Sequence, residues 1–249
     1  MNLRCIILAA LLALSGIAQA ADTAPRLFVP QLLGAQYTFI DQHQDALRSP
    51  YAGPLSLLPQ GDTERSHTFG AYFGVQLPAH FQYYFDLEMF KGEGVSGATG
   101  VGAIVNGDVV HSGNAGLGKR VYVARRYLRW TLPLGGTKHA VERAQDQLPG
   151  AESDRHLEAK IGRMTPGDDF DKNRYANTAR TQFMDGAFFN ALAWDYAADT
   201  RGYTNGMLLA YVSPHWTLRY GIYQMPTHAN GQTLEAPLQR ARGEQMQLT

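Results

Sequence analysis

The sequence predicts an all-β protein whose strands form a transmembrane antiparallel β-barrel. Two observations support this fold. Apolar and polar residues alternate along segments that approach ~10 residues, enough to cross a bilayer at a tilt, whereas globular strands average nearer ~5–6 residues. The polar sides of these segments carry charges, as in Asp86 with Glu88 and Arg125 with Arg129, which suits a wet lumen. A soluble β-sandwich, which turns its apolar face inward, is the alternative fold.

The alternation defines two walls on each predicted strand, because successive side chains of a strand point to opposite sides. In residues 81–90, Phe85 and Leu87 share the apolar side, and Asp86 lies on the other. In residues 120–132 we expect Tyr122 and Ala124 on the apolar side and Val123 on the polar side, and Arg126 interrupts the apolar side. The predicted strands lie near residues 33–40, 67–77, 81–90, 120–132, 156–164, 204–213 and 215–224, with an eighth from about Gly243.

The connections between these strands are of two kinds. Residues 77–81 and 213–215 form tight turns, whereas residues 41–67 and 91–120 form long polar loops. Since outer-membrane barrels have short periplasmic turns and longer outer loops, residues 133–155 become a periplasmic connection with a short helix near 141–147. Residues 165–203 become one outer loop. Aromatic residues near strand ends are candidates for the interfacial girdles of the barrel: Phe81, Phe90, Trp130, Trp216 and Tyr223.

The N-terminus predicts export. Arg4 precedes an apolar run over residues 6–14, and Ala18-Gln19-Ala20 resembles a signal-peptide cleavage site, which leaves residues 21–249 as one barrel domain. The apolar run is shorter than the roughly 20 residues of a membrane-spanning helix. Cys5 is the only cysteine, so residues 21–249 contain no disulfide. A formal net charge of +0 argues against a nucleic-acid partner.

Four stretches resemble carbohydrate-selective outer-membrane porins, and the similarity runs from about Leu33 to the end. They are GVSGATG (94–100), AQDQLPG (144–150), GDDFDKNRY (167–175) and WDYAADTRGY (194–203). The resemblance implies a barrel of roughly sixteen strands and passive uptake of sugars. This sequence would supply about the first half, and its end at Gln247-Leu248-Thr249, without the usual terminal aromatic residue, gives the expectation of an incomplete barrel.

Candidate site residues follow from the polar walls and from the long loop 165–203. Solute selectivity in such proteins depends on pore width and on the polarity of the lining. The strand candidates are Asp86, Glu88, Arg125, Arg129, Glu158, Lys160 and Arg219, with Tyr84, Tyr127 and Tyr223 as aromatic surfaces. The loop is the candidate constriction, with Asp168, Asp169, Asp171, Lys172, Arg174 and Arg180 beside Phe170, Tyr175, Phe183 and Trp194. The alternatives are salt bridges that only stabilise the barrel and a loop that is an ordinary solvated turn.

No catalytic or metal site is predicted. The sequence has no Gly-x-Ser-x-Gly, His-Glu-x-x-His or phosphate-loop motif. The acidic run Asp168–Asp171 lacks the spacing of an EF-hand loop. We therefore expect facilitated diffusion of carbohydrates or similar small polar solutes across a bacterial outer membrane, without a cofactor. The protein would contact the lipid of that membrane, and the sequence leaves open whether it forms a homotrimer. A barrel enzyme of the lipase or deacylase type and a non-conducting binding barrel are the alternatives.

Overall fold

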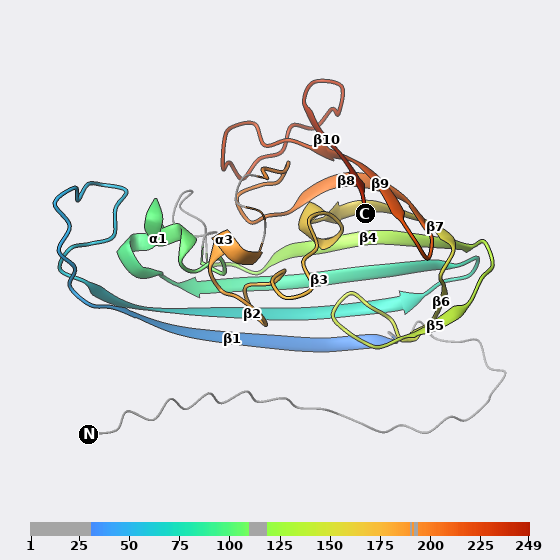
Figure 1. Cartoon of the computed structure of the whole chain (residues 1–249), viewed down its shortest axis with the longest axis horizontal. Coiled ribbons are helices and arrows are strands. Elements are labelled where there is room, and N and C mark those ends of the chain that lie inside the picture. The colour runs from blue at the N-terminus through green and yellow to red at the C-terminus, as the bar shows by residue number, and fades with distance from the viewer. Residues whose placement is uncertain (1–30, 110–118, 190, 192–193) are drawn as a thin grey trace.

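The chain folds into one curved antiparallel sheet. The computed structural model describes residues 31–109, 119–189, 191 and 194–249, so the predicted signal peptide lies outside the described residues. The strands of the sheet follow one another in chain order, and β5–β6 form a separate hairpin (Figure 1). The all-β antiparallel prediction is confirmed. The eight strands are β1 (Leu32–Gln44), β2 (Asp62–Gln76), β3 (Phe81–Gly92), β4 (Tyr122–Pro133), β7 (His156–Met164), β8 (Thr204–Val212), β9 (Thr217–Gln224) and β10 (Arg242–Leu248).

The two ends of the sheet differ in the length of their connections. At one end of the strands, here called the tight-turn edge, short turns join β2 to β3 and β8 to β9. The 134–155 connection between β4 and β7 lies at this edge too, and it contains the hairpin of β5 (Lys138–Val141) and β6 (Gly150–Ser153). The opposite, long-loop edge carries the loop 165–203, as predicted. The β3–β4 loop contains the short helical turns η1 (Val95–Ala98) and α1 (Val101–Ile104). The loop 165–203 contains η2 (Pro166–Asp168) and α3 (Gly186–Phe189).

The sheet is open within the described residues, because β1 and β10 are its outermost strands and do not pair with each other. The first three strands have 13, 15 and 12 residues, longer than a typical globular strand. In the described part of the chain, no helix is both long and apolar enough to span a bilayer.

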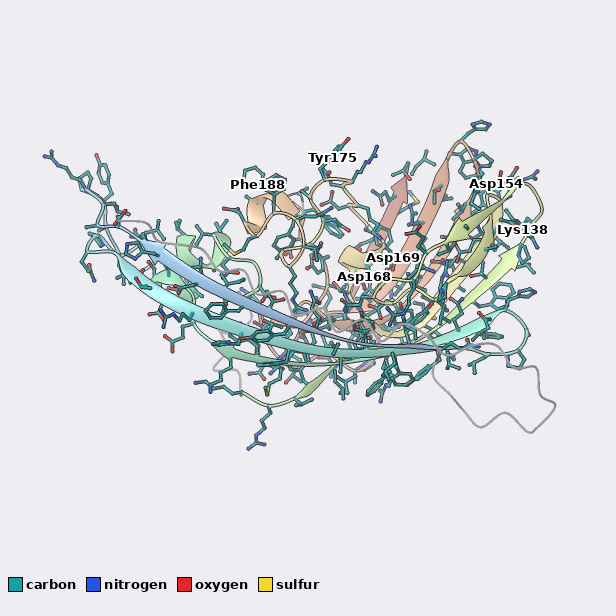
Figure 2. All side chains as sticks on the ribbon, turned by 90° about the horizontal axis from the view of Figure 1, so that it is seen from below. Lys138, Asp154, Asp168, Asp169, Tyr175 and Phe188 are labelled. Carbon is teal, nitrogen blue, oxygen red and sulfur yellow. The ribbon has the colours of Figure 1, made fainter. Side chains whose placement is uncertain are left out.

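Burial is inverted relative to a water-soluble protein. On the convex face, Leu33 is 71% exposed, Leu209 62% and Ile161 54%. On the concave face, Asp86 is 1% exposed and Glu88 is 2% exposed. A soluble sandwich would bury the apolar wall and expose the charged one, so the alternative fold is wrong. Figure 2 shows the curvature of the sheet and the long-loop segments that lie on its concave side.

A β-bulge in β4 changes the predicted phase of one strand. Asp86 pairs with Arg125, whereas the next residue, Leu87, pairs with Val123. The extra residue, Ala124, shifts the alternation, so Val123 shares the convex face with Leu87. Tyr122 lies opposite Glu88 on the concave face. The prediction that placed Tyr122 on the apolar side and Val123 on the polar side was wrong.

Two further predictions need correction. Phe90 and Tyr223 do not lie on the convex face and cannot belong to an interfacial girdle, because both side chains are buried. The other three predicted girdle residues lie at the tight-turn edge, where Phe81 packs against Trp130 with ring centroids 6.4 Å apart and Trp216 lies near Tyr211. The helix expected near residues 141–147 is absent, because that segment is the loop at the tip of the β5–β6 hairpin.

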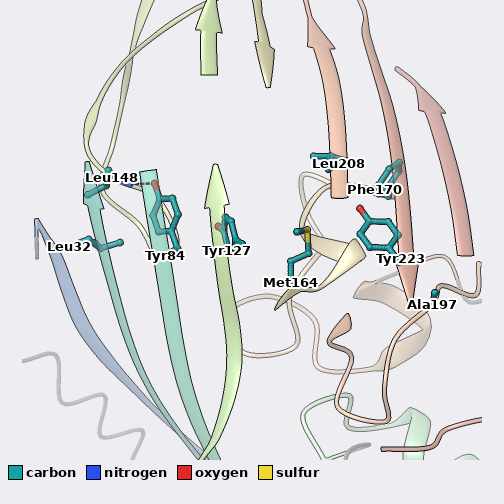
Figure 3. Close-up of a cluster of buried hydrophobic side chains, with 9 residues drawn as sticks. All are labelled: Leu32, Tyr84, Tyr127, Leu148, Met164, Phe170, Ala197, Leu208 and Tyr223. Carbon is teal, nitrogen blue, oxygen red and sulfur yellow. Dashed lines mark hydrogen bonds between the residues drawn. The ribbon is translucent and has the colours of Figure 1, made fainter. Parts of the chain in front are cut away.

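A cluster of apolar side chains attaches the inward-folded segments to the concave face (Figure 3). Tyr84 and Tyr127 stack with ring centroids 5.3 Å apart. Gly74 leaves room for the ring of Tyr84, since a Cβ at Gly74 would lie 2.9 Å from two ring atoms. Strands β1, β3, β4 and β7 to β9 and the segments 134–155 and 165–203 contribute to the cluster. It comprises Leu32, Tyr84, Tyr127, Leu148, Met164, Phe170, Ala197, Leu208 and Tyr223.

Candidate functional site: a charged cavity on the concave face

A cavity of about 1420 Å³ lies on the concave side of the sheet. Residues of β1, β3, β4 and β7 to β10 line it, together with segments that fold inward from both ends of the strands. The wall carries many charged side chains, because the alternation of each strand turns its polar positions inward and the inward-folded segments add further charges. The cavity therefore offers both hydrogen-bond donors and acceptors to a polar solute.

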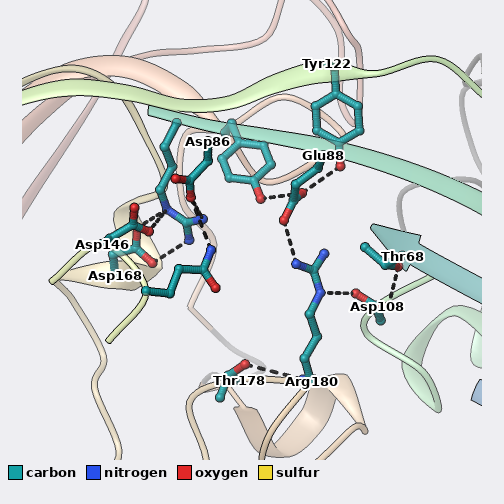
Figure 4. Close-up of polar contacts among 12 residues, drawn as sticks. Thr68, Asp86, Glu88, Asp108, Tyr122, Asp146, Asp168, Thr178 and Arg180 are labelled. Atoms are coloured by element: carbon teal, nitrogen blue, oxygen red, sulfur yellow. Dashed lines mark hydrogen bonds and ion pairs between the residues drawn. The ribbon is translucent and has the colours of Figure 1, made fainter. Parts of the chain in front are cut away.

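Arg125 of β4 is the centre of the first charged cluster, whose carboxylates Asp86, Asp146 and Asp168 are labelled in Figure 4. Its Nε and Nη2 donate to the two carboxylate oxygens of Asp168, at 2.7 and 2.9 Å. Its guanidinium also lies 3.3 Å from Asp86 on β3 and 3.3 Å from Asp146. Asp168 belongs to the long-loop edge and Asp146 to the tight-turn edge, so one arginine joins segments from opposite ends of the sheet. The bidentate contact fixes the plane of the guanidinium.

The second cluster extends along β4 and β7. Arg129 contacts Glu158 at 2.5 Å and Glu152 of β6 at 2.6 Å. Lys160 lies 2.5 Å from Asp169 and 3.7 Å from Glu158. These charges are largely buried, and buried charges are stable only when they are paired and hydrogen-bonded. The cluster therefore anchors the start of loop 165–203 to the sheet.

The third cluster surrounds Glu88. Arg180 of the long loop contacts Glu88 and Asp108, each at 2.6 Å. The hydroxyls of Tyr122 and Tyr203 both donate to the other oxygen of Glu88, each at 2.8 Å. Glu88 is thereby satisfied on both oxygens (Figure 4). Arg180 thus docks the loop 165–203 onto both β3 and the β3–β4 loop.

The loop carboxyl groups differ in their acidity. Burial pushes the pKa of Asp168 upward, but Arg125 more than offsets this effect and holds the pKa below its usual value. Burial raises the pKa of Asp169, and Lys160 opposes the shift only in part. Burial raises the pKa of Asp146 well above its usual value, and Arg125 again opposes the shift. Asp146 therefore holds a proton more tightly than an exposed carboxyl group does.

The structure places most of the predicted site residues on the cavity wall. Asp86 lies behind Arg125 and does not line the cavity, and Tyr84 and Tyr223 are buried in the apolar cluster. Asp171 accepts a hydrogen bond from the backbone of Ala191, and Arg174 is exposed with its guanidinium over Tyr175, so neither residue lines the cavity. The predicted residues that line the cavity are Glu88, Arg125, Tyr127, Arg129, Glu158, Lys160, Asp168, Asp169, Lys172, Arg180 and Arg219.

Several lining residues were not predicted. Gln145, Asp146 and Glu152 belong to the connection 134–155, which was predicted to be a periplasmic connection with a short helix. The signal in the sequence that could have indicated these lining residues was the stretch 144–150, one of the four that resemble porins. Asp108 and Tyr203 were missed as well, and they lie in or next to long loops whose inward fold depends on tertiary contacts.

Comparisons with known proteins give one similarity of fold. No protein-family model matches the chain, and no curated protein matches its sequence. A solved structure of OprB from Pseudomonas putida, determined at high pH, superposes with a TM-score of 0.47 and 12% sequence identity. The aligned region covers 81% of this chain and 44% of that chain, so this chain spans less than half the length of OprB.

Proposed function

We propose that this chain forms part of the wall of an outer-membrane porin, through which carbohydrates and similar small polar solutes diffuse passively. The observation that carries the proposal is the inverted burial of the sheet. Apolar side chains cover the convex face, where lipid would contact them, and ion pairs cover the concave face, where water and solute would pass. Only a β-barrel satisfies the backbone of such strands in a bilayer.

The energetics favour lipid as the environment of the convex face. Apolar surface in water costs about 25 cal/mol for each Å². Side chains such as Leu33, Ile161 and Leu209 are more than half exposed, and they lie on separate strands of one continuous face. A contiguous apolar surface of this kind marks a membrane or partner interface in an ordinary protein. Six of the eight strands, β1 to β4, β7 and β8, have 9 to 15 residues and are long enough for a tilted crossing.

The lining of the cavity fits a neutral, hydroxyl-rich solute. Arginine and carboxylate groups can donate to and accept from sugar hydroxyls, and the partly exposed ring of Tyr196 can contact the apolar C–H face of a sugar ring. The pairing of these charges leaves a polar wall with both kinds of partner. Carbohydrate as the solute class also rests on the four sequence stretches that resemble carbohydrate-selective porins.

The proposal is tested by transport through the refolded protein. The protein is inserted into planar bilayers and into liposomes, and conductance and the swelling rate in neutral sugars are measured. We expect stable ion conductance and swelling that slows as the sugar becomes larger. Conductance without sugar flux would refute the carbohydrate class. Membrane insertion without conductance would favour a binding barrel, and hydrolysis of ester or acyl substrates by the inserted protein would favour an enzyme.

A further inference from the structure

We propose that residues 142–149, here called the inner loop, form a second constriction of the passage from the tight-turn edge, with Asp146 as its positioning residue. This inference rests on the proposed porin function. It differs from the expectation that a constriction comes from the long loop 165–203 alone. The passage would then be narrowed from both ends of the sheet, and the two narrowing elements would meet at Arg125.

The β5–β6 hairpin carries the inner loop to the concave face. Val141 and Gly150 form the last pair of this hairpin, and the loop leaves from there. The loop closes on itself through two backbone hydrogen bonds of 3.2 Å between Ala144 and Gln147. Asp146 adopts a φ of 53°, a left-handed conformation that Asp tolerates better than most residues. The tip is therefore a defined turn.

Apolar contacts hold the inner loop against the sheet. Leu148 is 4% exposed and belongs to the concave apolar cluster with Leu32 and Tyr84. The backbone N–H of Leu148 donates to the hydroxyl of Tyr84 at 3.1 Å (Figure 3). Burial of this leucine side chain removes apolar surface from water and so stabilises the docked loop. The loop is thus packed against the sheet as part of the fold.

Polar contacts place the inner loop inside the cavity. Asp146 lies 3.3 Å from Arg125, and the amide of Gln145 donates to Asp86 at 3.2 Å (Figure 4). Asp168 reaches the same guanidinium from the long-loop edge. Residues 144–147 line the cavity, whereas Glu142 is exposed and is not a lining residue. Solute on the concave side therefore meets the tip of the inner loop and not its base.

The first experiment removes the constriction and keeps the hairpin. Residues 142–149 are replaced by Asn-Gly, which supplies the two-residue turn that a β-hairpin favours. Because the loop occupies space in the lumen, we expect single-channel conductance to rise by about 1.5-fold or more. The heat-dependent migration of the variant in gels shows whether it keeps the fold of the unmodified protein. Unchanged conductance of a correctly folded variant would overturn the proposal.

The second experiment locates the loop with a matched pair of cysteines in a Cys5→Ser background. Gln145→Cys and Glu142→Cys replace exposed residues of the same loop, but only Gln145 lines the cavity. A water-soluble thiol reagent should reduce the conductance of Q145C and leave that of E142C unchanged. Equal responses of the two variants would overturn the proposal.

A separate readout distinguishes failure of this inference from failure of the porin proposal. If the unmodified protein does not conduct, the pair is labelled with a bulky polymer maleimide. Slower labelling of Q145C than of E142C would still support the inward position of the loop, and equal rates would refute it. An Asp146→Ala variant should remove this difference in labelling if Asp146 positions the loop, and an unchanged difference would refute that role.

Discussion

Two neighbouring arginines of β4 should respond in opposite ways to the same substitution. The Arg125 side chain is 12% exposed and contacts Asp86 at 3.3 Å and Asp168 at 2.7 Å on the concave face. Arg126 is exposed on the convex face opposite Phe85, and it has no ion-pair partner among the residues that the structure describes. We therefore compare Arg125→Leu with Arg126→Leu.

The expected magnitudes follow from these surroundings. Removing Arg125 leaves several buried carboxylates without their cation, and the loss of one partner of a buried pair costs about 3–5 kcal/mol. Arginine on the lipid face of a barrel costs about 2–4 kcal/mol near the bilayer midplane and less toward the interface. R126L should therefore raise the free energy of unfolding by about 1–4 kcal/mol. The two substitutions should therefore change the free energy of unfolding in opposite directions.

The assay is reversible denaturant unfolding from lipid vesicles, with identical conditions for both variants. In a water-soluble sheet, a substitution of an exposed residue such as Arg126 usually changes stability by less than about 0.5 kcal/mol. A destabilised or unchanged R126L protein, together with a tolerated R125L, would refute the assignment of the two faces.

Three further predictions concern the convex face and the inner loop. Ile161→Lys should destabilise the protein in vesicles by about 2–4 kcal/mol near the midplane, and an unfolding curve that matches the unmodified protein would contradict a lipid-facing position. Tyr84→Phe removes the acceptor of the Leu148 N–H and should cost about 0.5–1.5 kcal/mol, which the same unfolding assay measures; no loss would mean that the bond does not hold the loop. Burial raises the pKa of Asp146 despite Arg125, so its contribution to stability is present in acid and is lost as the pH rises through that raised pKa. Asp146→Asn should flatten this part of the stability–pH profile, and an unchanged profile would refute the assignment.

The alternation of the strands was predictable because it is local. Phe85 and Asp86 occupy opposite faces, as their sequence positions require, and the tight turns fix the register of β2 with β3. The bulge at Ala124 was not predictable from the alternation, since one inserted residue reverses the phase without a compositional signal. The error at Tyr122 follows from this single residue.

The site was only partly predictable for a different reason. The inward charges of the strands, such as Glu158 and Lys160, follow from strand phase alone. The inner loop docks through contacts between residues far apart in the sequence, as Leu148 does with Tyr84 and Asp146 does with Arg125. From the sequence, this connection was predicted to be periplasmic. Its place in the cavity depends on the side chains that the finished sheet presents.

The orientation of one strand in a bilayer is the most direct test of the claim that the convex face meets lipid and the concave face meets water. Single cysteines at four consecutive positions of β7, Leu157, Glu158, Ala159 and Lys160, are labelled with a fluorophore in vesicles. Because the convex face meets lipid, a lipid-phase quencher should act on the labels at Leu157 and Ala159, and an aqueous quencher on those at Glu158 and Lys160. The reverse pattern, or uniform quenching from water along the strand, would contradict it.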